Sequence, residues 1–116
     1  MDDNEMRAKN VLERFGFNFK EEYRKEIRLL LEEEFDNYQP GSSEYLRALC
    51  GYLFCIGNPD DLELIEKIKW GINMDVGVMI GSEWINSMKG MSCDDDRTRE
   101  ELIEEYISYY EGYIDP

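Results

Sequence analysis

The sequence contains no histidine and only three cysteines, Cys50, Cys55 and Cys93. Without histidine, the chain lacks the commonest general base and cannot form a Ser-His or Cys-His nucleophile pair. Three cysteines without Cys-x-x-Cys spacing cannot supply a four-thiolate zinc site. The glycines also lack the spacing and the following lysine of a phosphate-binding loop. We therefore expect a protein that is not an enzyme and that uses no metal or other cofactor.

A long apolar run is also missing. The longest candidate, Tyr45–Ile56, contains the charged residue Arg47 and spans about three helical turns, whereas a membrane helix needs ~20 apolar residues. The first ten residues contain no apolar run, so no signal peptide is expected. The sequence therefore predicts a cytoplasmic protein whose cysteines stay reduced.

Basic residues are few. The chain has 13 Lys and Arg against 27 Asp and Glu, a net charge of −14, and half of it falls in residues 81–116, with three basic and ten acidic residues. Such a charge repels nucleic-acid phosphates and anionic lipids, so we expect neither as a partner. A basic protein is the natural complement, although solubility or adaptation to salt would produce a similar balance. The oligomeric state is left open.

The apolar stretch from Tyr45 to Ile56 predicts the central helix of a single domain over residues 1–116. Gly57 can adopt the left-handed conformation that ends helices, and Asn58 and Pro59 are typical of the start of the next one. Because this linker is so short, the two helices must fold back on each other.

Apolar spacing and capping residues predict the remaining elements. Segment 71–90 is ambiguous, because Val76, Val78 and Ile80 alternate as in a strand, but a lone strand would have no partner; we expect a loop or loose helix and then a helix from Ser82. Trp70 and Trp84 are expected in the core. The predicted fold is all-α, with five to six helices in successive antiparallel αα-hairpins, as a compact bundle or a short helical-repeat-like domain. The expected helices are 5–15, about 19–36, 45–56, 59–70, a short one from 82, and 97–111.

The predicted partner-binding residues are tyrosines and carboxylates, mostly of the last helix. A helix can direct only two or three of its four tyrosines inward. We expect Tyr106 and Tyr110 to face the core, and Tyr109 and Tyr113 to face solvent beside the carboxylates, unless this flank packs on the first helices. Tyrosine supplies contact area, and carboxylates attract lysine and arginine. The residues of this candidate site are Glu104, Glu105, Tyr109, Glu111 and Tyr113, with Asp94 and Asp95 in the preceding loop.

Glu32, Glu33 and Glu34 form a reserve site. They lie at the end of a predicted helix, where the dipole is negative and carboxylates are locally unfavourable. Asp94–Asp96 is a different acidic cluster, which could bind a hard cation. It lacks the alternating ligands and later glutamate of a calcium loop, so a solvated turn that caps the next helix is the preferred interpretation.

In size, acidity and helical class the chain resembles the immunity proteins that bacteria pair with polymorphic or contact-dependent toxins. The resemblance carries no diagnostic motif, so it assigns no role to a particular residue. It implies a cytosolic protein that binds and neutralises a basic cognate toxin domain, which in many such pairs is a nuclease.

Two other functions remain open. The chain could be a helical-repeat adaptor that binds a peptide in a groove, which an apolar or asparagine-lined concave surface would favour. It could also be an acidic mimic of DNA, which needs long rows of carboxylates and little exposed aromatic surface.

The cysteines provide a first test. Cys50 and Cys55 lie in the apolar stretch and should react poorly, whereas Cys93 lies in a polar loop and should be modified first by a thiol reagent under native conditions. Mass spectrometry of the partly labelled chain measures the order. Equal modification of all three would show that the apolar stretch is exposed.

Overall fold

The structure, a computed structural model, describes residues 2–90 and 97–114. In these two ranges it contains only helices and the segments that connect them. It confirms the all-α class. Seven α-helices occur in these ranges instead of the predicted five to six, because segment 71–90 forms two short helices and not one. The helices are α1 (Asp3–Phe15), α2 (Arg24–Asp36), α3 (Glu44–Ile56), α4 (Leu62–Gly71), α5 (Met74–Met79), α6 (Ser82–Lys89) and α7 (Arg99–Ile114), and the two 3-10 segments are η1 (Glu21–Tyr23) and η2 (Pro59–Asp61).

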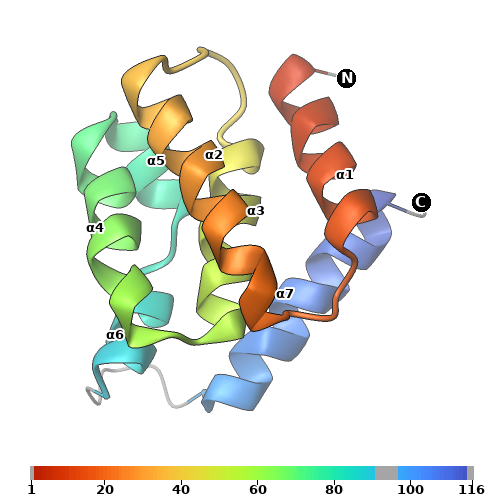
Figure 1. Cartoon of the computed structure of the whole chain (residues 1–116), viewed down its shortest axis with the longest axis vertical. Coiled ribbons are helices and arrows are strands. Elements are labelled where there is room, and N and C mark those ends of the chain that lie inside the picture. The colour runs from red at the N-terminus through yellow and green to blue at the C-terminus, as the bar shows by residue number, and fades with distance from the viewer. Residues whose placement is uncertain (1, 91–96, 115–116) are drawn as a thin grey trace.

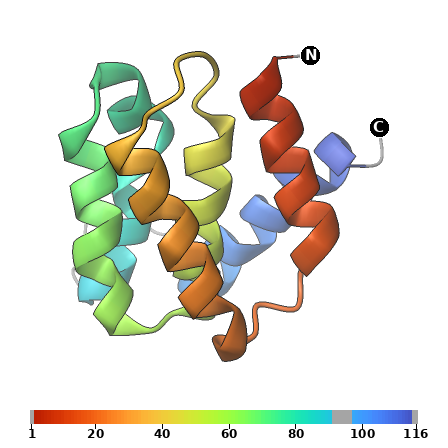
Figure 2. The same ribbon diagram turned by 45° about the horizontal axis from the view of Figure 1, so that its top comes forward.

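The helix α3 is central, as predicted. Eleven of its thirteen residues are buried, so it meets neighbours on every side. Figures 1 and 2 show it in the middle of the molecule, with α1 on one side and α4 on the other. Leu49 and Leu53 are completely buried, and each such side chain contributes about 1.5–3 kcal/mol through the removal of apolar surface from water.

The first helix packs mainly on α3 and not on its sequence neighbour α2. Ala8 and Leu12 are fully buried in this contact, and the Tyr52 hydroxyl donates to the Phe15 carbonyl at 3.3 Å. Helices α1 to α4 alternate in direction (Figure 1), yet the packing of α1 on α3 departs from a series of sequence-adjacent pairs.

A buried carboxylate ties α2 to the start of α4. Asp61 is completely buried and accepts hydrogen bonds from Arg24 Nε at 2.7 Å and Arg28 Nη1 at 2.7 Å. The sequence places Asp61 in the positive first turn of the predicted helix but does not predict its arginine partners. Loss of one partner of such a buried ionic group leaves the other charge uncompensated, which typically costs about 3–5 kcal/mol.

The turn between α3 and α4 agrees with the prediction. Gly57 has φ 85° and ψ 18°, the left-handed conformation, and the Asn58 side chain accepts from the Asp60 amide at 2.9 Å. Pro59 then begins the 3-10 segment that leads into α4. The predicted helix at 19–36 begins later than expected, because residues 21–23 form a 3-10 turn before α2.

Segment 71–90 is helical where the sequence was ambiguous. Val76 and Ile80 are fully buried, and they fix α5 against the core. Trp84 in α6 is buried, as expected, whereas the prediction for Trp70 is wrong: its side chain is 70% exposed. Trp70 lies next to Lys69 near the end of α4, and it is Lys69 that is turned inward there.

Cys50 and Cys55 are buried and free, as predicted. Burial raises the pKa of both thiols, that of Cys55 to about 12, so the reactive thiolate is scarce at neutral pH. Cys93 and the acidic loop Asp94–Asp96 lie outside the described residues. In residues 2–90 and 97–114, no helix combines the length and apolarity that a bilayer crossing requires.

The central position of α3 leads to a stability prediction. Leu53→Ala should lower the free energy of unfolding by about 2–5 kcal/mol, through lost apolar burial and the cavity left behind. Urea denaturation measures the change. Leu29→Ala is the matched control, because Leu29 is 53% exposed and its truncation should change stability by no more than about 0.5 kcal/mol. Similar shifts for both variants would contradict the central role of α3.

Candidate binding surfaces

Two inward tyrosines attach α7 to α3. Tyr106 and Tyr110 are buried, and the Tyr106 hydroxyl donates to the Ala48 carbonyl at 2.6 Å. Gly51 makes this approach possible, because a Cβ atom there would lie 2.3 Å from the Tyr106 ring and 2.8 Å from the Trp84 ring. Both tyrosines face inward, as their positions on the helix predict, whereas no sequence pattern indicates the role of Gly51.

A buried carboxylate organises the neighbouring tyrosines. Glu44 is 7% exposed, and its two oxygens accept from the Tyr109 hydroxyl at 2.6 Å and the Tyr110 hydroxyl at 3.0 Å. The Arg47 guanidinium lies over the rings of Tyr109, Tyr110 and Trp84, at 4.4, 5.3 and 5.1 Å from their centroids. We call these five residues the Glu44–Arg47 cluster.

The cluster limits what the predicted tyrosine anchors can offer. Tyr109 keeps 47% of its surface exposed, but its hydroxyl is already bonded to Glu44. Tyr113 is half-buried, and its hydroxyl, although buried, has no hydrogen-bond partner in the described residues. Of the two, Tyr109 therefore presents mainly an aromatic ring to a partner, and Tyr113 presents less surface than predicted.

The carboxylates of α7 form an exposed surface, as the sequence predicts. We call Glu100, Glu101, Glu104, Glu105 and Glu111 the α7 acidic face, since all five side chains are exposed.

Only part of this face has local partners. Glu105 pairs with Arg97 at 2.6 Å, and Glu101 accepts from the Thr98 amide at 3.2 Å while Thr98 caps the helix in return. Arg99 turns inward to the Cys55 carbonyl.

The reserve site is divided by the structure. Glu32 and Glu33 are exposed, but Glu34 is 5% exposed and pairs with Arg7 at 2.6 Å. The expectation that Glu34 joins an exposed acidic patch is therefore corrected: the carboxylate binds α1 to α2.

Predicted site residues Asp94 and Asp95 lie outside the described residues. No cluster of His, Cys, Asp and Glu that could hold a metal ion occurs in residues 2–90 and 97–114.

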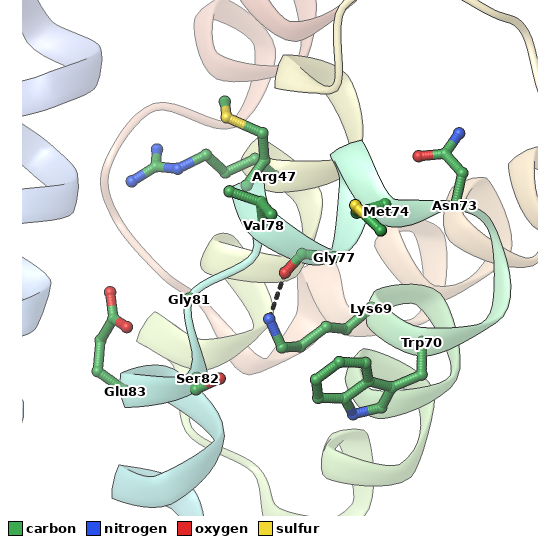
Figure 3. A pocket seen from close by; sticks show the side chains of 11 residues that line it. Arg47, Lys69, Trp70, Asn73, Met74, Gly77, Val78, Gly81, Ser82 and Glu83 are labelled. Carbon is green, nitrogen blue, oxygen red and sulfur yellow. Dashed lines mark hydrogen bonds between the residues drawn. The ribbon is translucent and has the colours of Figure 1, made fainter.

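Sequence reasoning missed a hollow of about 800 Å³ between α4, α5 and α6. Figure 3 shows Trp70, Lys69 and Val78 around it. We call it the α5 hollow. Arg47, Asn73, Met74 and Glu83 also line it. The signal that could have identified it is the group of large apolar residues in a segment too short to bury all of them.

Lys69 is the unusual group of the hollow. It is only 4% exposed, and its ammonium donates to the carbonyls of Gly77 and Ile80 at the end of α5. Burial lowers the pKa of Lys69, and the charge of Glu83 opposes this shift. The two carbonyls replace only part of the water that an exposed ammonium would bind.

Comparison of the chain with protein-family models, with curated proteins and with solved structures finds no match.

The tyrosines of the core and of the Glu44–Arg47 cluster predict a loss of stability at alkaline pH. Burial raises the pKa of Tyr52 and Tyr109 to about 12 and also raises that of Tyr106 and Tyr110. In the unfolded chain tyrosines ionise near pH ~10, so their contribution to stability is full below that pH and is lost as the pH rises through the folded values.

Tyrosinate absorbance and helical circular dichroism, recorded on the same samples, should therefore change together above pH ~10. The urea-unfolded chain serves as the control for unperturbed tyrosines. Complete ionisation near pH ~10 with the helical signal intact would show that the tyrosines are not buried.

Proposed function

We propose that the chain is a binding protein without catalytic activity, which captures a basic partner protein through the α7 acidic face. By its resemblance to immunity proteins, the partner is a cognate toxin domain in the cytoplasm. The supporting observation is the set of α7 carboxylates that no cation neutralises: Glu100, Glu104 and Glu111 have no ion pair with any described residue.

The contrast with α2 strengthens this proposal. Glu26 accepts from Arg14 at 2.8 Å, and Glu34 pairs with Arg7 at 2.6 Å. These α2 carboxylates serve contacts within the fold, whereas most of the α7 carboxylates do not. A surface whose negative field is left uncompensated attracts a positively charged protein over about one Debye length, ~8 Å at physiological salt.

Tyr109 is the anchor expected at the edge of this face. Its ring is held by the Arg47 guanidinium and by its bond to Glu44, so it loses little conformational freedom when a partner covers it. Aromatic side chains that are fixed in this way are common among residues that dominate binding energy. The carboxylates would then govern encounter, and the ring would govern the lifetime of the complex.

A nuclease domain would suit such a surface, because binding to nucleic acid requires clustered lysine and arginine. An acidic inhibitor that covers these lysines and arginines of the nuclease would block access of the nucleic-acid phosphates. This part of the proposal comes from the resemblance and from charge complementarity together.

A peptide-binding adaptor is the second candidate. The α5 hollow favours it, since its lining combines exposed Trp70, Met74 and Val78 with Asn73. The two functions need not exclude each other, because the hollow and the acidic face are formed by different helices.

The proposal is tested by capture of a partner from the native cell and by the kinetics of the purified pair. The retained protein should be basic, and Glu104→Gln with Glu105→Gln should lower its association rate and the salt dependence of that rate. Glu13→Gln with Glu63→Gln is the matched control, because both residues are exposed and lie outside α7. Failure to retain a basic protein at low salt, or an association rate indifferent to salt, would refute the proposal.

The tyrosine is tested separately. Tyr109→Ala should raise the dissociation rate about tenfold or more, whereas Tyr109→Phe keeps the ring and should leave that rate nearly unchanged. Equal effects of the two substitutions would show that the bond to Glu44 matters and not contact with the partner.

A further inference from the structure

Exposed apolar side chains gather at the α5 hollow. Trp70, Met74 and Val78 are 70%, 85% and 76% exposed, and they are three of the six large apolar side chains exposed in the described chain. Met74 and Val78 are four residues apart on α5 and therefore project from the same side of that helix. Three such residues around one hollow are characteristic of a surface that contacts another molecule.

The helix α5, which displays Met74 and Val78, is held by buried contacts on its other side. Val76 and Ile80 are completely buried, and the Asn73 side chain accepts from the Val76 amide at 2.9 Å. The Lys69 ammonium donates to the carbonyls of Gly77 and Ile80. These carbonyls lie at the C-terminal end of α5, where the helix itself supplies no hydrogen-bond donor for them. The apolar side chains are therefore presented in a preformed arrangement, which reduces the entropic cost of binding.

The hollow also holds an incompletely compensated positive charge. Buried charges are normally paired with an opposite charge, but Lys69 has no ion pair among the residues described. Two of its three N–H donors are used by the carbonyls, and the ammonium lies 4.7 Å from the centroid of the Trp70 ring. The third N–H has no hydrogen-bond acceptor among the described residues. Figure 3 shows the ammonium between Trp70 and Gly77 on the wall of the hollow.

No carboxylate of the lining forms an ion pair with Lys69. Glu83, the one carboxylate among the lining residues, favours the charged form of Lys69 but lies 4.0 Å from Arg97 and makes no ion pair with Lys69. The Arg47 guanidinium is held by the rings of the Glu44–Arg47 cluster, so Lys69 is the positive group that the hollow offers in a chain of net charge −14. The electrostatic complement of the hollow is thus opposite in sign to that of the α7 acidic face.

We propose that the α5 hollow binds a segment of a partner protein in which an apolar side chain stands next to a carboxylate. The apolar side chain packs against Trp70 and Val78, and the carboxylate accepts from the third N–H of Lys69. A second copy of this chain is a poorer occupant, because two molecules of charge −14 repel each other. The inference rests on the second candidate function, peptide binding at the hollow, and does not depend on the proposed function of α7.

Random peptides displayed on phage test this inference without a known partner. The library is selected on the wild-type chain at physiological salt, where the repulsion of anions by distant carboxylates is screened, and peptides that also bind the Trp70→Ala chain are removed. The selected peptides should share an apolar residue close to Asp or Glu. They should bind Trp70→Ala at least about tenfold more weakly than wild type.

The carboxylate is tested on the peptide, since a change of Lys69 could unfold α5. Replacement of the Asp or Glu of a selected peptide by Asn or Gln should weaken its binding to the wild-type chain at least about tenfold. Val78→Asp should abolish binding, and its exposed position makes the folded state tolerant of the change. Leu29→Ala is the control, because Leu29 is an exposed apolar residue of α2, away from the hollow. The Leu29→Ala chain should bind the peptides within about twofold of wild type.

Three results would overturn the inference. The first is a selection that yields no Trp70-dependent peptide. The second is a set of binders that lack a carboxylate or tolerate its replacement. The third is a concentration-dependent dimer in sedimentation that Val78→Asp dissociates, which would identify a second copy as the occupant. A basic partner of α7 could still be found in each case, so the two proposals fail independently.

Discussion

Burial of α3 on every side is the constraint on which the other contacts depend. A helix without a solvent-facing side cannot be covered by one neighbour, so α1, α2, α4 and α6 all pack against it, and the tyrosines of α7 close the remaining gap. Its polar residues must then find partners inside the fold. Glu44 does so through two tyrosine hydroxyls, and Arg47 does so by stacking on aromatic rings. The Glu44–Arg47 cluster is thus a direct result of the position of α3.

The same requirement divides the acidic residues into two groups. Carboxylates such as Asp61 and Glu34 are enclosed by arginines and hold helices together. Those of α7 face outward and remain available to another molecule. Net charge alone does not distinguish the groups, because each carboxylate counts once in the sum whether it is buried or exposed.

Much of the fold could be predicted from local sequence signals. The continuous apolar stretch identifies α3, and Gly57 with Asn58 and Pro59 fixes the turn after it, because these residues act through their own backbone preferences. The partners of Glu34 and Asp61 could not be predicted, since both depend on arginines from other helices. Trp70 was misplaced because periodicity does not show which of two adjacent side chains, Lys69 or Trp70, will pack against the next helix. The acidic face could be predicted because its residues lie on one helix. The hollow could not be predicted because it is formed where several helices meet.

The two tryptophans sit in opposite environments, and this gives the chain two distinct optical reporters. Trp84 is 3% exposed and lies between Phe54 and the Arg47 guanidinium, so its emission reports the core. Trp70 is 70% exposed at the rim of the hollow, so its emission is shifted to the red and is open to collisional quenchers. A neutral quencher reaches Trp70 freely, whereas the access of iodide depends on the balance between the Lys69 ammonium beside the ring and the net charge of −14. The difference between the two quenchers therefore measures the electrostatic potential at the hollow without any label.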